Sequence, residues 1–176
     1  MNKVADGFCY SYVVKETSDK GLGVFAEVDI KQGSIVWRHV PGLYKVFNES
    51  AFNKPIADMT REEIVYELTH VFGLPEFPNC VIRVFDPGVL FNHSSDHSLI
   101  TNNATPLENP LDETSPNYTD AVTKALLDDR YAMVATRDIK AGEEFTNNYA
   151  LEVSDPPFFE AIYDQYDIDD GYVDSD

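Results

Sequence analysis

The chain has 176 residues, of which 43% are apolar and 12% aromatic, a composition that suits one domain with a packed core and argues against disorder. Its 31 acidic and 13 basic side chains give a formal net charge of -18, which argues against direct binding of nucleic acid. Such a surface attracts Lys- and Arg-rich partners, unless it serves only to keep the protein in solution.

The cysteine content and the apolar patterning bear on where the protein works. No apolar run approaches the ~18 residues of a membrane span, and the first ten residues contain no hydrophobic signal segment. Cys9 and Cys80 are too few for a disulfide framework or a thiolate zinc site. We therefore expect an intracellular protein, cytoplasmic or nuclear if the host is eukaryotic, that is neither secreted nor attached to a membrane.

Strands are predicted for the first quarter of the chain. Residues 8–15 are rich in aromatic and β-branched side chains, and residues 24–37 suggest strand, turn and strand. Between them, residues 17–23 form a turn-rich stretch whose glycines allow close approach of the backbone to a ligand. The pattern of residues 41–47 is compatible with a further strand.

The clearest helix is predicted over residues 59–73. Thr60 and Glu63 form a capping box at its start, and Gly73 followed by Pro75 marks its end. The apolar residues that share one face of this helix are Ile64, Val65, Leu68, Val71 and Phe72.

The second half alternates short strands with loops. Residues 80–85 predict a strand, and residues 89–100 form an apolar lead into a polar cluster with two histidines. Residues 101–130 indicate a long loop whose last third could add a helical turn or two. A strand begins at Tyr131, and a helix with a largely aromatic face is predicted over residues 156–166.

One short pattern occurs twice, near the two ends of the chain. Five residues recur at the same spacing, which suggests two similar strand–turn–strand units, although chance can produce such a match. They are Ala26, Asp29, Ile30, Lys31 and Gly33 in the first copy, and Ala135, Asp138, Ile139, Lys140 and Gly142 in the second.

Several common sites are excluded by their spacing. The chain contains no Gly-rich phosphate loop and no G-x-S-x-G nucleophile. The acids at 167–170 lack the spacing of a calcium loop, so residues 167–176 are expected to be a mobile acidic tail. His93 and His97 are four residues apart outside a helix and have no evident third ligand, so no metal site is expected.

Tyr149 ends the segment from Tyr131, after a strand, a turn at Ala141-Gly142 and a short second strand. It follows two amides, Asn147 and Asn148. A buried, hydrogen-bonded tyrosine is the common case, and a phenol that takes part in chemistry is the alternative.

Three segments, taken together, resemble a known family. They are KGLGVFA at 20–26, FNHSSD at 91–96 and ATRDIKAGEEFTNNY at 135–149. Each is weak alone, but their order and spacing resemble those of SET-domain protein-lysine methyltransferases, particularly the small stand-alone bacterial-type members. The likeness runs from about Tyr10 to Tyr166.

The resemblance implies a mainly β SET fold, β-clip-like, in which several small twisted sheets and a few short helices surround a knot-like crossing of two segments. It implies a single SET domain over residues 1–166, with a helical insert at 59–73, a long loop at 101–130 and a C-terminal helix at 156–166, followed by the acidic tail.

The resemblance also implies S-adenosylmethionine as methyl donor, S-adenosylhomocysteine as product, and no metal. Three groups of positions match the family's donor site: the backbone of one loop, the crossing, and an aromatic side chain that covers the adenine. For the aromatic side chain, plain core packing is the alternative. The positions are Lys20, Gly21, Leu22 and Gly23 in the loop, Asn92 and His93 at the crossing, and Phe158 or Phe159.

By motif position, Tyr149 is the implied catalytic residue and Asn147 the implied substrate-lining residue. The implied activity is N-methylation of a lysine in a basic, histone-like or other Lys-rich protein; a SET-like module that only binds basic peptides or the donor, and a purely structural protein, are the alternatives. The chain departs from the usual pattern at His97, Ser98 and Asn148, and at Asn147, where relatives often carry an aromatic that helps to set the number of methyl groups added.

Overall fold

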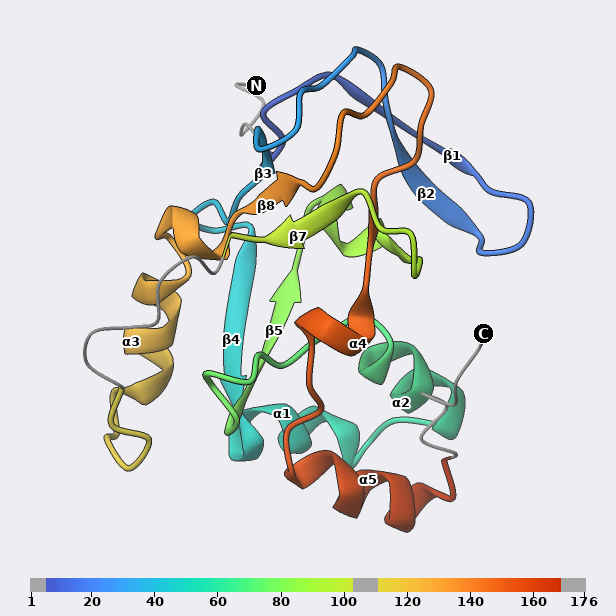
Figure 1. Cartoon of the computed structure of the whole chain (residues 1–176). Helices are drawn as coiled ribbons and strands as arrows, with labels where there is room; N and C mark the ends of the chain where they lie inside the picture. Colours follow the sequence, from blue (N-terminus) through green and yellow to red (C-terminus); the bar gives the residue numbers. More distant parts are fainter. Residues whose placement is uncertain (1–5, 103–110, 169–176) are drawn as a thin grey trace, which may run out of the picture.

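The computed structural model describes residues 6–102 and 111–168. Within these residues the strands form four small sheets, joined by short helices. Helices α1 (Glu49–Ile56), α2 (Arg61–Leu68) and α5 (Phe158–Tyr166) lie together at one end of the molecule (Figure 1). The hairpin of β1 (Tyr12–Glu16) and β2 (Leu22–Ala26) lies at the other end. Small sheets with a few short helices agree with the architecture expected from the sequence. None of the helices in the described ranges is both long and apolar enough to cross a membrane.

The N-terminal hairpin pairs β1 (Tyr12–Glu16) antiparallel with β2 (Leu22–Ala26). Its turn closes where the Thr17 backbone N–H donates to the Gly21 carbonyl oxygen at 2.7 Å, and Gly21 has φ of 75°, a conformation that favours glycine. The strand predicted from residue 8 therefore starts later, because Phe8 instead forms a bridge with Trp37 in another part of the fold.

The three-stranded sheet has the order β3-β8-β7 and joins distant parts of the chain. β8 (Met133–Ala135) lies between β3 (Ile35–Trp37) and β7 (Leu99–Thr101), antiparallel to both. The strand predicted at the start of the 131–149 segment is thus the central strand of this sheet.

A two-stranded sheet of β4 (Tyr44–Asn48) and β5 (Cys80–Val84) carries the helical insert. The insert contains α1 (Glu49–Ile56), which the sequence pattern did not reveal, and α2 (Arg61–Leu68). The predicted capping box of Thr60 and Glu63 is present, but the prediction that the helix continues to residue 73 is wrong. The helix ends early because Phe72 pairs through its backbone with Ile82 of β5.

The repeated pattern brings its two copies face to face. The backbones of Ile30 and Ile139 form an antiparallel bridge, and Gly33 and Gly142 each donate a backbone hydrogen bond to the alanine that opens the other copy. Each lysine of the repeat also pairs with the aspartate of the other copy. These pairs are Lys31 Nζ with Asp138 Oδ2 at 2.6 Å, and Lys140 Nζ with Asp29 Oδ2 at 2.9 Å.

A parallel pair of very short strands forms a crossing of two distant segments. β6 (Asn92–His93) pairs with β9 (Thr146–Asn147). The pairing continues where the Ser94 N–H donates to the Asn147 carbonyl at 2.9 Å and the Ser98 N–H donates to the Thr146 carbonyl at 3.1 Å. Residues 92–98 and 144–147 are therefore held together by main-chain hydrogen bonds.

The remaining helices are short. Within the region expected to be a loop, residues 103–110 lie outside the described residues, and the rest contains α3 (Tyr118–Ala125) and the 3-10 helix η2 (Asp129–Tyr131); another 3-10 helix, η1, spans Pro87–Leu90. α4 (Tyr149–Glu152) was not predicted, whereas α5 (Phe158–Tyr166) matches the predicted C-terminal helix. Most of the predicted acidic tail, residues 169–176, also lies outside the described ranges.

Two hydrophobic clusters form the core. The larger lies between the sheets and includes Val24, Leu99 and Phe145, all fully buried. The smaller lies among α1, α2 and α5 and includes Ile64 and Phe159. Helix α4, which follows the crossing, lies between the β3–β8–β7 sheet and helices α1, α2 and α5 (Figure 1).

Candidate active site

The three segments singled out in the sequence meet at the crossing. Lys20 Nζ donates to the His93 carbonyl oxygen at 2.7 Å, and Asn92 Nδ2 donates to the Leu22 carbonyl oxygen at 3.1 Å. The Tyr149 backbone N–H donates to His93 Nδ1 at 3.2 Å. His93 thus contacts both the glycine loop and the start of α4, so residues 20–23, 92–93 and 149 form one site.

Gly23 lies where the glycine loop passes closest to the crossing. A Cβ atom at this position would lie 2.4 Å from Glu144 Oε1 and 3.0 Å from Asn92 Nδ2, too close for either contact. Glu144 Oε1 itself accepts a hydrogen bond from Asn92 Nδ2 at 2.7 Å. A larger residue here would displace the Glu144 carboxylate, a reason for glycine that the sequence alone did not supply.

Tyr149 is the first residue of α4, directly after the crossing. Its hydroxyl donates a hydrogen bond to the backbone carbonyl oxygen of Phe91, just before β6, and its ring lies 5.5 Å from the His93 ring, centroid to centroid. The phenol is therefore fixed at both its hydroxyl and its backbone. Tyr149 is thus half-buried and hydrogen-bonded, and its side chain also borders a cavity.

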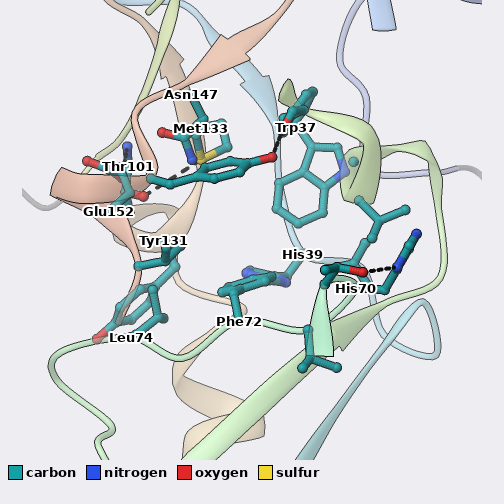
Figure 2. Close-up of a pocket in the computed structure, with 18 residues that line it drawn as sticks. Trp37, His39, His70, Phe72, Leu74, Thr101, Tyr131, Met133, Asn147 and Glu152 are labelled. Atoms are coloured by element: carbon teal, nitrogen blue, oxygen red, sulfur yellow. Dashed lines mark hydrogen bonds between the residues drawn. The ribbon is translucent and has the colours of Figure 1, made fainter. Parts of the chain in front are cut away.

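This cavity has a volume of about 110 Å³ and is lined mostly by apolar and aromatic side chains (Figure 2). In Figure 2, Asn147, Met133, Thr101 and Glu152 lie near one another at one side, with His39 and Phe72 facing them and His70 farther away. Further lining residues are Trp37, Val71, Leu74, Val84, Val89, Phe91, Tyr131, Tyr149 and Val153.

The glycine loop does not line this cavity, and neither do Asn92 and His93. Tyr149 borders the cavity and also bonds His93, which in turn accepts from Lys20. The glycine loop and the cavity therefore approach each other through the crossing, with Tyr149 between them.

Trp37 forms one wall of the cavity and is held by Asp86. Its indole N–H lies 3.0 and 3.1 Å from the two carboxylate oxygens of Asp86, which also accept the backbone N–H groups of Gly7 and Gly88 at 2.8 Å. A Cβ at Gly88 would lie 2.6 Å from the indole nitrogen, so the indole fits closely against this backbone.

Three polar side chains of the cavity are buried. His39 and Asn147 are 6% and 8% exposed, and Glu152 is 9% exposed. Burial lowers the pKa of the His39 imidazole to about 4, so this ring is neutral at pH 7. The Glu152 carboxylate accepts the backbone N–H of Thr101 at 2.7 Å, which ties α4 to β7.

Phe158 and Phe159 lie on α5, in the smaller core cluster. The Phe159 ring is buried, with its centroid 5.3 Å from that of Phe52 on α1, and Phe158 lies 6.1 Å from the same ring. The structure places both against α1, which is the core packing considered as the alternative to covering the donor. The adenine-covering role stays a prediction.

The departures from the family pattern have structural partners. Ser98 is fully buried; its hydroxyl donates to the Glu144 carbonyl at 3.2 Å and accepts the Thr146 N–H at 2.9 Å. The His97 carbonyl accepts the Thr136 hydroxyl at 2.8 Å. Residues 97 and 98 therefore stabilise the crossing. Asn148 Oδ1, in contrast, is buried without a hydrogen-bond partner among residues 6–102 and 111–168.

No group of three or more His, Cys, Asp or Glu side chains is arranged to hold a metal ion in the part of the chain that the structure describes. The Lys20 ammonium and the Glu144 carboxylate instead bond to neighbouring residues of β6, His93 and Asn92, so the site offers one charge of each sign. Such a set suits a ligand with both a carboxylate and an ammonium group.

Comparison with known proteins identifies the family. The SET domain model matches residues 21–150, which is most of the chain, and the chain belongs to the SET-domain family. The family assignment and the SET fold expected from the three segments are thus confirmed. No curated protein matches the chain significantly.

Two solved structures show the same fold. The Neurospora SET domain protein DIM-5, a histone lysine methyltransferase, matches with a TM-score of 0.52 and 20% identity, over 85% of this chain and 55% of DIM-5. ctPRC2 in an autoinhibited conformation bound to S-adenosylmethionine matches with a TM-score of 0.54 and 17% identity, over 92% of this chain and 17% of that one. The chain therefore spans only part of each of these proteins.

Sequence reasoning located Tyr149, Asn147, the glycine loop and the crossing, but missed most of the cavity. Trp37 ends β3, His39 lies in the loop after it and Glu152 ends α4, and none of them belongs to a local motif. The sequence analysis singled out none of these three; the one available signal was that Trp37 is the single tryptophan of the chain.

Proposed function

We propose that the protein transfers a methyl group from S-adenosylmethionine to the side-chain amine of a lysine in a basic protein. The observation that carries this proposal is the position of Tyr149, which connects the glycine loop and crossing to an apolar cavity. The net charge of -18 supports a Lys-rich partner, because opposite charge accelerates encounter and favours association.

The residues around the glycine loop fit the donor chemically. The methionine end of S-adenosylmethionine carries a carboxylate and an ammonium. Lys20 Nζ, the Glu144 carboxylate and the loop backbone would hold these two groups. Asn92 and His93 would hold the adenosine. The donor supplies the methyl group on a cationic sulfonium.

The cavity fits the acceptor. Its apolar walls suit the four methylene groups of a lysine stem. At pH 7.4 an ordinary lysine with a pKa of ~10.4 must lose a proton, at a cost of about 4 kcal/mol, and a dry site next to a cation lowers that cost. The Tyr149 hydroxyl and the Phe91 carbonyl then orient the amine, whose nitrogen forms the new bond to carbon as the carbon–sulfur bond breaks.

A second candidate is a SET-like module that binds the donor or basic peptides without turnover. It is favoured by Asn148, which stands where relatives carry an aspartate and whose Oδ1 has no partner within the described ranges. The two candidates differ in what Tyr149 is expected to do.

Methylation of a mixture of basic proteins by the purified chain, compared with Tyr149→Phe, tests the proposal. The substitution keeps the ring and removes the hydroxyl, so we expect a loss of activity of about a hundredfold with donor affinity retained. Turnover by neither form, although both bind the donor, would favour the binding module.

Calorimetric titration with S-adenosylmethionine and S-adenosylhomocysteine tests the donor site separately. Gly23→Val places a branched side chain against Glu144 and Asn92, so it should abolish binding. Val28→Ala, at an exposed residue in the next turn, is the matched control and should bind normally. Failure of the folded wild type to bind either ligand, with or without a basic peptide, would refute the methyltransferase proposal.

A further inference from the structure

The cavity sets a few polar side chains in mostly apolar walls. Trp37, Phe72 and Met133 contribute hydrophobic surface, while Glu152 and Asn147 contribute oxygen atoms. Hydrogen-bond acceptors in apolar surroundings favour a ligand that brings donors, and the faces of aromatic rings favour one that is cationic.

Glu152 supplies the negative charge of the cavity. It is 9% exposed, and it lies one turn after Tyr149 on α4. Its carboxylate accepts one backbone N–H, from Thr101, which leaves most of its capacity as an acceptor unused by that bond. It forms no ion pair with a basic side chain of residues 6–102 or 111–168. A buried carboxylate without a cation is costly, which points to a cationic ligand.

Two neutral groups of the cavity also have unused hydrogen-bonding capacity. Asn147 Oδ1 and His39 Nδ1 are buried, and neither has a hydrogen-bond partner in the described part of the chain. Because burial lowers the pKa of His39 to about 4, its ring carries no charge at neutral pH and does not repel a cation. Both residues line the same cavity as Glu152.

We propose that Glu152 makes this cavity selective for a protonated alkylamine, with Asn147 and His39 as neutral acceptors in the same cavity. This inference rests on the proposed function and deepens it, since it assigns to Glu152 the recognition of the lysine ammonium before the amine loses its proton. Glu152 is a specificity residue in this scheme, whereas Tyr149 acts on the amine after deprotonation. A purely apolar cavity would instead take neutral alkyl groups equally well.

The test uses the full chain labelled with ¹³C at its methionine methyl groups. The protein has three methionines, and Met133 lines this cavity whereas Met59 lies in the smaller core cluster. Titration with n-butylammonium, a lysine side-chain mimic, should shift the Met133 signal and leave Met59 unchanged. Neutral n-pentanol, followed by the same Met133 signal, should bind with an affinity at least about tenfold lower. Equal affinities for the two probes would overturn the proposal.

Glu152→Gln removes the charge but keeps an oxygen that accepts the Thr101 N–H, so the fold is expected to persist. We expect the variant to bind butylammonium about tenfold more weakly than the wild type and to bind pentanol equally. Glu160→Gln, at an exposed site on α5, changes the net charge equally and should behave as wild type. Unchanged butylammonium affinity in Glu152→Gln, or an equal loss in Glu160→Gln, would contradict the assignment.

Kinetics separate this inference from the proposed function. With a lysine substrate, Glu152→Gln should raise KM by about tenfold without lowering kcat, because the carboxylate binds the ammonium and, by favouring its charged form, opposes rather than aids its deprotonation. Selective butylammonium binding without methylation of any basic protein would refute the proposed function alone. Methylation with an unchanged KM in Glu152→Gln would refute the role of Glu152 alone.

Discussion

The buried imidazole of His39 should make the stability of the protein depend on pH. Its ring is 6% exposed and packs edge-on against Trp37 and Tyr44, with centroids at 4.7 and 4.9 Å. Burial lowers its pKa from the ordinary 6.5 to about 4. The unfolded chain therefore takes up a proton on His39 at a higher pH than the folded protein does.

This difference sets the direction and size of the effect. The contribution of neutral His39 is complete above pH 6.5 and is lost as the pH falls through 6.5 toward 4. A pKa difference of about 2.5 corresponds to about 3 kcal/mol of unfolding free energy when the loss is complete, and to about 2 kcal/mol by pH 5. Such a loss is a substantial part of the stability of a small domain.

Urea unfolding at pH 7.5, 6 and 5, followed by the fluorescence of Trp37, measures this loss. His39→Phe keeps a ring in the same place and cannot titrate. Between pH 7.5 and 5 the wild type should therefore lose about 2 kcal/mol more unfolding free energy than the variant does. Carboxylates with lowered pKa values contribute equally to the pH dependence of stability in both proteins. His97→Gln, at a partly exposed site, should keep the wild-type pH dependence. Identical pH profiles for wild type and His39→Phe would refute the reasoning.

Three substitutions test the contacts that hold the site. Asp86→Ala leaves the Trp37 indole N–H and two backbone N–H groups without their acceptor and should cost about 3 kcal/mol in urea unfolding. Ser98→Ala removes two hydrogen bonds at the crossing, including the one to the Glu144 carbonyl, and should cost about 2 kcal/mol and weaken donor binding in calorimetry. Gly73→Ala places a Cβ 2.3 Å from a backbone oxygen before α5 and should lower the melting temperature by several degrees, about 1–2 kcal/mol.

Each of these predictions has an outcome that contradicts it. Wild-type stability in Asp86→Ala would mean that other groups hold Trp37. A Ser98→Ala protein that binds the donor normally would separate the crossing from the donor site. An unchanged melting temperature in Gly73→Ala would show that the segment before α5 moves aside without cost. Ser95→Ala, at a neighbouring exposed serine, is the control for Ser98→Ala.

The sequence was informative where local chemistry decides the structure. The capping box of Thr60 and Glu63 fixed the start of α2, since both hydrogen bonds form within four residues. The repeat around Ile30 and Ile139 was visible as spacing, and the C-terminal helix as an aromatic face following two prolines. These features depend on neighbours in the chain, so the chain itself reports them.

The family motifs were also readable, because the glycine loop, the crossing segment and Tyr149 are short local patterns that occur in a set order. The reason for glycine at position 23 was not readable. It depends on Glu144, more than a hundred residues away, whose carboxylate occupies the space that a side chain would need.

Only the tertiary structure decided the remaining features. α2 ends early because Phe72 pairs with β5, a contact made across the fold that overrides the apolar periodicity continuing to residue 73. The cavity brings together His39, Asn147 and Glu152 from separate elements, and their burial, missing partners and unused acceptors exist only once those elements pack. Local hydrogen bonds and periodicity therefore determined the elements and the motifs, whereas packing between distant segments determined the shape and charge of the site.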